Sequence, residues 1–323
     1  MALLSNSKKA LFGFLLVTLM SSLHAYPTKP IKLVVPYPAG GAADVMARGL
    51  ALKMSTELGQ QVVIDNRGGA SGSTASEMVA KSNPDGYTLL FGAMQTHAIN
   101  PALYDKLRYD PIKDFAPISL THINPRVLVV SSSLQINSVA ELVALAKKKA
   151  DSVSFGSAGN GSASHLAGVL FGNLTGADLL HVPYKGSAPL VTDLLSGRVS
   201  ISFDSYTVYA SHIKSGKVKA LAVTSRDRMQ VLPDVPTLNE SGLKGYEILN
   251  WLGLLAPAGT PGTVIKTLNR VAVQSMKSAD LRQQLLDVGV EPTFSTPSQF
   301  SDLIRADGVK WAEIVKKSGA TID

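Results

Sequence analysis

The sequence contains no cysteine, few aromatic residues and no concentrated block of charge. Without cysteine, the 323-residue chain cannot have a disulfide framework, a thiolate metal site or a lipidated N-terminal cysteine. Aromatic side chains make up 6% of the residues, and the formal net charge of +7 is diffuse, which argues against nucleic-acid binding. A mild positive excess does attract small anions over distance. With 45% hydrophobic residues, the chain can be stabilised by its core alone, and its length favours two domains.

The first 25 residues have the pattern of a secretory signal peptide. Lys8 and Lys9 precede an apolar run, 10–20, that is too short to span a bilayer, and Ser21, Ser22 and Ala25 supply small residues around the expected cleavage site. We expect cleavage after Ala25, which leaves a periplasmic chain of 298 residues beginning at Tyr26. A buried N-terminal helix is the alternative interpretation.

Motifs of catalysis and of metal or nucleotide binding are missing from the sequence. No serine has glycine both two residues before and two residues after it, so the nucleophile elbow of an α/β hydrolase is absent. No H-E-x-x-H motif occurs, and the histidines lack metal-ligand spacing. Gly159-Asn160-Gly161 matches the start of a dinucleotide fingerprint, but Ser164 stands in the place of its third glycine. We therefore expect a protein that is not an enzyme and that uses no cofactor or metal.

Short apolar runs alternate with segments of helical periodicity, which predicts an α/β fold with mainly parallel sheets. Capping patterns at Ser138–Glu141, Thr260–Pro261 and Thr296–Gln299 predict the starts of three helices. Beyond Gly245 we expect helices and little strand. The predicted strands are Ile31–Val35, Val62–Asp65, Tyr87–Gly92, Val127–Val130, Val153–Phe155, Leu179–Val182, Val199–Asp204 and Lys219–Thr224.

Two glycine-rich turns, within residues 34–44 and 154–165, connect a predicted strand to a predicted helix. Glycine allows the backbone to approach a ligand closely. The following helix presents unpaired N–H groups and the positive end of its dipole, which favour a carboxylate or phosphate. The sequence therefore predicts a binder of small anions, held by N–H groups at Gly40-Gly41 and Gly159–Ser162.

A series of short motifs runs through nearly the whole mature chain. They are Val35–Gly41 with Asp44 and Arg48, Asp65–Ala70, Pro84–Leu90, Asp114–Ile118, His181–Gly186, Leu232–Thr237, and Trp251 with Ala256–Pro261. In this order, they resemble the periplasmic receptors of tripartite tricarboxylate transporters, also called Bug receptors.

The resemblance implies a two-lobed clamshell like the periplasmic binding proteins, in which each lobe is a sheet flanked by helices and the chain crosses the hinge twice. We expect the first lobe over 26–126, after the signal peptide of 1–25, the second lobe over 127–247, and a return of C-terminal helices to the first lobe over 248–323. The family also implies a monomer that captures a small organic carboxylate by backbone groups and bound waters, without an arginine clamp. Its partners would be the membrane permease subunits of a tripartite transporter.

Candidate ligand-binding residues lie in the two turns and at strand ends. Asp44 also suits a purely structural role at a helix start, paired with Arg48, and Trp251 suits hinge or core packing. Asp204 would repel an acid unless it met an amine or hydroxyl group on the ligand. The candidates are Tyr37, Ala39, Gly40, Gly41, Ser71, Gly72, Thr96, His97, Ala158, Gly159, Gly161, Ser162, His165, Lys185, Asp204 and Tyr206.

Two other functions remain open from the sequence. A secreted α/β hydrolase or transferase could act on acyl or phosphorylated substrates, although the missing motifs count against it. A receptor that signals to a membrane kinase would keep the same binding site and change only the partner.

Overall fold

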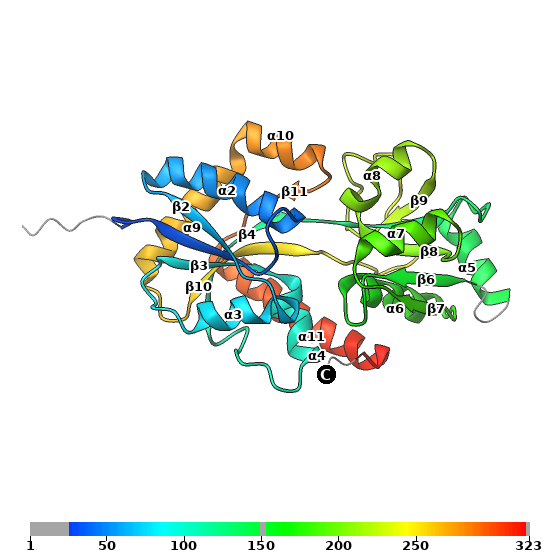
Figure 1. Ribbon diagram of the computed structural model, residues 1–323, viewed down its shortest axis with the longest axis horizontal. Helices are drawn as coiled ribbons and strands as arrows, with labels where there is room; N and C mark the ends of the chain where they lie inside the picture. Colours follow the sequence, from blue (N-terminus) through cyan, green and yellow to red (C-terminus); the bar gives the residue numbers. More distant parts are fainter. Residues whose placement is uncertain (1–25, 149–152, 321–323) are drawn as a thin grey trace, which may run out of the picture.

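The computed structural model describes residues 26–148 and 153–320, so the predicted signal peptide lies outside the described part of the chain. Two lobes lie side by side, each built on a sheet flanked by helices (Figure 1). The structure therefore confirms the two-lobed α/β clamshell. Both sheets are mixed, so the expectation of mainly parallel sheets was wrong.

The first lobe has a sheet with the strand order β11-β4-β10-β3-β1-β2. Strand β1 pairs in parallel with β2 and β3, whereas β10 pairs antiparallel with β3 and β4. Its strands are β1 (Ile31–Val35), β2 (Val62–Asn66), β3 (Thr88–Ala93), β4 (Phe115–Ile123), β10 (Trp251–Pro257) and β11 (Glu291–Pro292). Its helices are α2 (Ala42–Leu58), η1 (Ala70–Gly72), α3 (Ser73–Ala80), η2 (Gln95–Ile99), α4 (Asn100–Leu103), α9 (Gly262–Lys277) and α10 (Ala279–Asp287).

The second lobe has a sheet with the strand order β7-β6-β8-β5-β9. Strand β5 is antiparallel to β8 and β9, and β6 is parallel to β7 and β8. Its strands are β5 (Arg126–Ser131), β6 (Ser154–Ser157), β7 (Leu180–Pro183), β8 (Ile201–Ser205) and β9 (Val218–Val223). Its helices are α5 (Val139–Lys148), α6 (Ala163–Thr175), α7 (Ser187–Leu195) and α8 (Tyr206–Lys214).

Strands β4 and β10 are the main elements that the sequence did not predict. The segment of β4 is interrupted by Pro117, which lacks a backbone donor and sits at an irregularity of the pairing with β10. All seven residues of β10 are buried, so its apolar run shows no alternation between two faces. The expectation of little strand beyond Gly245 was therefore wrong, because β10 lies inside the first sheet.

The capping patterns predicted the positions of all three helix starts, and two of the three expected side-chain caps are present. At α11 (Pro297–Ser318), Thr296 and Gln299 form a complete capping box. At α5, the Ser138 hydroxyl accepts the N–H of Glu141. At α9, by contrast, the Thr260 hydroxyl donates to the carbonyl of Pro257 and does not cap the helix.

The chain passes between the sheets at two adjacent crossings. One joins β4 to β5, and the other leads from the loop after β9 into β10. The crossings are hydrogen-bonded to each other, because the N–H of Asn124 donates to the carbonyl of Asn250 over 2.9 Å. Helix α11 packs on β4 in the first lobe and also contacts α6 in the second (Figure 1). The last helix therefore spans both lobes.

Candidate ligand-binding cleft

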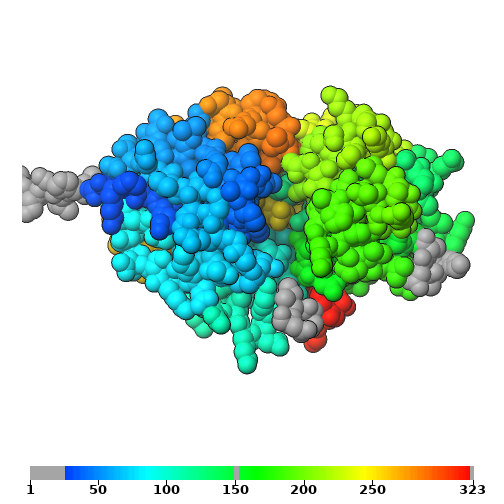
Figure 2. Space-filling model, in the orientation of Figure 1, coloured from blue at the N-terminus to red at the C-terminus, as the bar shows by residue number. Residues whose placement is uncertain are grey.

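A cleft with a volume of about 960 Å³ lies between the two lobes. It is visible in Figure 2 as a hollow between the blue and green parts of the surface. The first lobe contributes the start of α2, and the second contributes the start of α6 and the ends of β5 and β8. The crossing residues Asn124 and Asn250 lie at its edge. This volume suits a small-molecule ligand.

The start of α2 presents free backbone donors to the cleft. Gly41 is the N-cap residue, and no side chain caps the helix. Within the described residues, the N–H groups of Gly41, Ala42 and Ala43 have no acceptor, and all three residues line the cleft. Four consecutive glycine or alanine residues, 40–43, leave this end of the helix open to a ligand.

Asp44 holds this turn in place through hydrogen bonds. Its buried carboxylate accepts the N–H of Gly40 over 2.9 Å, and it also bonds to Arg48 Nε and Asn66 Nδ2. The hydrogen bond from Arg48 is the main reason that the pKa of Asp44 falls to about 2, against the opposing effect of burial. The structural role and the pairing with Arg48 are therefore confirmed.

The second glycine-rich turn uses most of its own N–H groups internally. Gly161 N–H donates to His165 Nδ1, and Ser162 N–H donates to the carbonyl of Gly159. The N–H of Gly159 is bonded to the Ser157 hydroxyl. Three of the four predicted donors in Gly159–Ser162 therefore have partners already. Within the described residues, the free N–H groups that line the cleft here are those of Asn160, Ala163 and Ser164.

Ser162 supports the turn through its hydroxyl. It is the N-cap of α6, where its oxygen accepts the N–H of His165, and it donates to the carbonyl of Gly159 over 2.6 Å. Because its one hydroxyl proton has this acceptor, Ser162 shapes the turn and has no proton left for a ligand. Neighbouring Ser164 Oγ accepts the N–H of Ala158.

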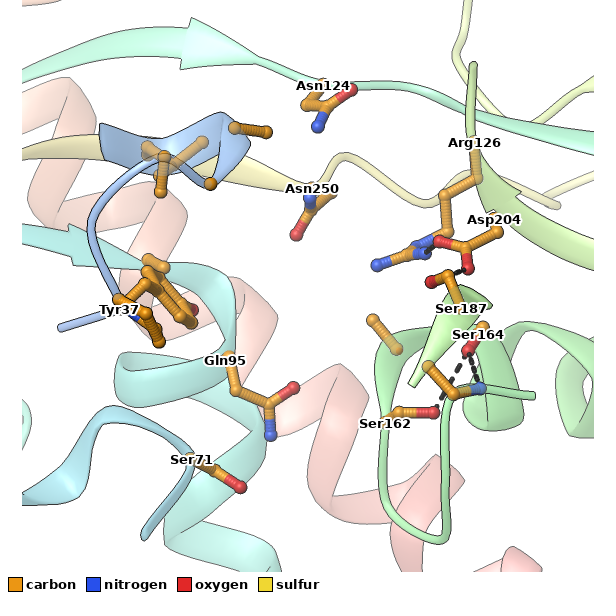
Figure 3. Close-up of a pocket in the computed structure, with 18 of the residues that line it drawn as sticks. Tyr37, Ser71, Gln95, Asn124, Arg126, Ser162, Ser164, Ser187, Asp204 and Asn250 are labelled. Atoms are coloured by element: carbon orange, nitrogen blue, oxygen red, sulfur yellow. Dashed lines mark hydrogen bonds and ion pairs between the residues drawn. The ribbon is translucent and has the colours of Figure 1, made fainter. Parts of the chain in front are cut away.

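An ion pair forms the wall of the cleft in the second lobe (Figure 3). Arg126 Nη1 lies 2.9 Å from Asp204 Oδ1. Asp204 also accepts the N–H of Ser205, and its other oxygen accepts the Ser187 hydroxyl over 2.6 Å. Among the described residues that line the cleft, these are the only side chains with a full charge, and their charges cancel. The side chains that line the cleft therefore carry no net charge.

The structure places some of the candidate residues in the cleft. They come from both turns, from η1 and from β8. The candidates that line the cleft are Tyr37, Ala39, Gly40, Gly41, Ser71, Ala158, Gly161, Ser162 and Asp204.

The remaining candidates lie outside the cleft lining. Thr96 and His97 are buried in the first lobe, where His97 contacts the rings of Phe115 and Trp251. Burial lowers the pKa of His97 to about 3, so this histidine is a neutral core residue.

Five further candidates have structural surroundings of their own. Gly72 has no room for a side chain between Thr96 and Pro36, and Gly159 lies against the backbone of Tyr184. Lys185 is exposed, and His165 stacks on His181 in a groove separate from the cleft. Tyr206 packs against Gly289 of the other lobe.

The sequence interpretation missed several polar residues that line the cleft. Asn124 and Asn250 could have been found from the expected hinge crossings, because residues at a hinge border the cleft. Gln95 follows the end of β3, where ligands of α/β sheets gather. Nothing in the sequence indicated the pairing of Arg126 with Asp204. The residues concerned are Gln95, Asn124, Arg126, Ser164, Ser187 and Asn250.

The described residues contain no group of three or more histidine, aspartate or glutamate side chains that could hold a metal ion. Over the same part of the chain, no helix has the length and apolar character needed to cross a membrane.

The fold and the cleft define a two-lobed solute-binding protein, and comparison with known proteins identifies its family. A model for the tripartite tricarboxylate transporter family receptor matches residues 46–320. Protein BugT of Bordetella pertussis is 37% identical over 302 residues, which is 93% of each chain.

Two solved structures are also similar. The structure of R. palustris Rpa4515 with adipate has a TM-score of 0.80 at 36% identity, covering 92% of this chain and 99% of its own. MatC (Rpa3494) from Rhodopseudomonas palustris with bound malate has a TM-score of 0.75 at 32% identity, covering 90% of this chain and 100% of its own. The chain belongs to the tripartite tricarboxylate transporter receptor family.

Proposed function

We propose that this protein captures a small organic carboxylate between its lobes and delivers it to the permease subunits of a tripartite transporter. The observation that carries the proposal is the set of free N–H groups at the start of α2, which open into a cleft whose side-chain charges cancel. Such a helix start binds one negative charge without a cationic side chain. The dicarboxylates present in the two related structures support an organic acid as the ligand.

In this proposal, the N–H groups of Gly41, Ala42 and Ala43 hold a carboxylate from the first lobe. The free N–H groups of Ala163 and Ser164, at the start of α6, face the same cleft from the second lobe. Bound waters can complete the contacts where the distance is too long for direct hydrogen bonds. A ligand held in this way contacts both lobes and favours their closure.

A screen of organic acids tests this function. Purified protein is heated with mono-, di- and tricarboxylic and aromatic acids, and positive results are measured by calorimetry. A ligand at about 100 times its Kd should stabilise the folded state by roughly 2.7 kcal/mol. If only non-acidic solutes bind, the proposal is wrong.

We also propose that the chain is exported and works in the periplasm as a monomer. The basic residues, the apolar run and Ala25 support a cleavable signal peptide. In a Gram-negative host, the intact mass of the periplasmic protein should correspond to a chain that begins at Tyr26. Full-length protein retained in the cytoplasm would contradict export.

We further propose that the protein has no catalytic activity. The absent hydrolase motifs support this, as does membership in a family of receptors. The experiment that distinguishes a hydrolase or transferase is turnover on a broad panel of acyl and phosphorylated compounds. A sensor of a membrane kinase would bind the same acids, so the neighbouring genes distinguish it from a transport receptor.

A further inference from the structure

An apolar crevice with a volume of about 450 Å³ lies beside the cleft, between α2 and α10 of the first lobe and α8 of the second. Figure 1 shows α10 and α8 next to each other at the upper edge of the molecule, one from each lobe. Among the described residues that line the crevice, none carries a charge, and only Thr207 and Gln284 are polar. The crevice is therefore far more apolar than the cleft beside it.

One face of α2 joins the crevice to the cleft. Ala42, Val45 and Gly49 are spaced by three and four residues, so they lie on the same face of the helix, and all three line the crevice. Ala42 lines the cleft as well, together with Met46 and Gly40, which also line both spaces. A Cβ atom at Gly40 would meet no atom within 4 Å, so the space beside this residue is open. The two spaces are therefore continuous at the start of α2.

Contacts between the helices give the crevice defined walls. Gly49 allows α10 to pack closely on α2, because a Cβ atom there would lie 2.9 Å from Leu281 Cδ1. From the second lobe, Tyr206 at the start of α8 packs against Gly289, which follows α10. Between Ala42 and Gly49 the shared face of α2 extends roughly 10 Å along the helix axis, at a rise of about 1.5 Å per residue.

Large apolar side chains in the crevice remain in contact with solvent. Val45 is 50% exposed, and Val288, directly after α10, is 43% exposed. Removing such surface from water is favourable in proportion to its area. A charged or strongly polar group, by contrast, would lose its hydration here and gain few partners. The crevice therefore suits a hydrocarbon chain or ring.

We propose that this crevice is part of the ligand site and holds an apolar group of the acid whose carboxylate binds at the start of α2. The inference rests on the proposed function, which places that carboxylate on the N–H groups of Gly41, Ala42 and Ala43. From there, the apolar group follows the shared face of α2 away from the helix start. The ligand is then an amphipathic acid, with its charge in the cleft and its hydrocarbon part in the crevice.

A series of straight-chain monocarboxylates, from propionate to decanoate, tests the proposal in the whole protein. Calorimetry should show an affinity that rises about four-fold for each added methylene group, the effect of moving that group out of water. The rise should stop once the chain is longer than the crevice. Over the same part of the series, the heat capacity change of binding should become more negative, because apolar surface is buried.

Two variants that fill the crevice assign the effect of chain length to it. Val45→Phe and Val288→Phe each enlarge a half-exposed side chain, and they lie on different segments, so both variants should fold. In each of them, the affinity for decanoate should approach the affinity for propionate. The matched control is Leu52→Phe, because Leu52 is 68% exposed on the same helix as Val45 but lies outside the crevice. It should keep the wild-type dependence on chain length.

The outcomes separate this inference from the function on which it rests. Equal affinities across the wild-type series would overturn the inference and leave the carboxylate receptor intact. Binding of polar di- or tricarboxylates without binding of any monocarboxylate would have the same consequence. A chain-length effect that survives in both filled variants would also overturn it, because the chain would then lie in the cleft. If no carboxylate binds at all, the proposed function fails and the inference fails with it.

Discussion

At the scale of single residues, side chains hold the backbone of the two glycine-rich turns in place. Asp44 fixes Gly40 through the bond to its N–H, and Ser162 fixes Gly159 through the bond to its carbonyl. Gly161 has a φ of +69°, a conformation that a side chain would strain whether or not it blocks a ligand. Substitution at the start of α2 is a cleaner test of whether backbone N–H groups bind the ligand, because Gly41 has an ordinary extended conformation there.

Ala42 offers a way to remove one backbone donor without disturbing the helix. It is the first residue of α2, where proline is well tolerated because the N–H has no partner within the helix. Ala42→Pro should weaken binding of an acid by about ten- to a hundred-fold, the effect of losing one hydrogen bond to a charged group, roughly 1.5–3 kcal/mol. Calorimetry with the best acid from the screen measures this loss.

Ala42→Val is the matched control, since it adds similar bulk to the cleft and keeps the N–H. The difference between the proline and valine variants isolates the donor. Equal affinities for the two variants would show that the N–H of Ala42 does not contact the ligand.

At the scale of elements, two stacked histidines join the second glycine-rich turn to its sheet. The rings of His165 and His181 lie 4.0 Å apart between centroids, and Phe155 stacks on His181. His165 Nδ1 accepts the N–H of Gly161, and His181 Nε2 lies 2.7 Å from the Ser157 hydroxyl. His165 can accept this N–H only while its Nδ1 is unprotonated.

These contacts make the folded protein sensitive to acid. Burial lowers the pKa of His165. The pKa of His181 falls from 6.5 to about 4, mainly because the ring is buried and in second place because of the charge of His165. The unfolded chain therefore binds protons that the folded chain does not, so stability is greatest above pH 6.5 and falls as the pH decreases toward 4. Denaturant titrations at several pH values should show this loss.

His181→Phe should reduce the pH dependence of the unfolding free energy over this range, because it keeps the stacked ring and removes the titrating group. Ser157→Ala provides the control, since it removes the same hydrogen bond but leaves the histidine. It should lower stability at every pH and retain the wild-type slope. A slope that is unchanged in His181→Phe would mean that the stacked pair does not contribute to acid sensitivity.

The sequence predicted elements well where local signals suffice and less well where distant segments meet. The strand positions of β1 and β2 and the capping box at Thr296 follow from neighbouring residues alone. Strand β10 could not be recognised, because its leucine-rich sequence contains no β-branched residue, whereas β5, which is also fully buried, is rich in valine and was predicted. In the cleft, Arg126 meets Asp204 across 78 positions of sequence. Helix starts are local features, whereas ion pairs between strands depend on topology.

At the scale of the whole molecule, the cleft and the two crossings predict a change of shape on binding. Free N–H groups from both lobes face the same space, so a ligand that satisfies both sets stabilises the closed arrangement. The hinge consists of two short segments joined by the bond from Asn124 to Asn250.

We expect small-angle scattering to show a smaller radius of gyration when a saturating acid is added. Helix α11, which contacts both lobes, should limit this change to a rotation about the crossings. The comparison uses the same protein with and without a ligand whose binding calorimetry has established. An unchanged radius of gyration would indicate a rigid cleft that is already closed.

The tryptophans are intrinsic fluorescent probes of this architecture. The chain has two, and both are fully buried. Trp251 begins β10 immediately after the second crossing, and its indole N–H donates to Asp307 of α11 over 2.6 Å. Trp311 lies one turn further along the same helix. Because Trp251 follows the second crossing and Trp311 belongs to the helix that contacts both lobes, we expect closure on a ligand to change the intrinsic fluorescence, without a label on either lobe.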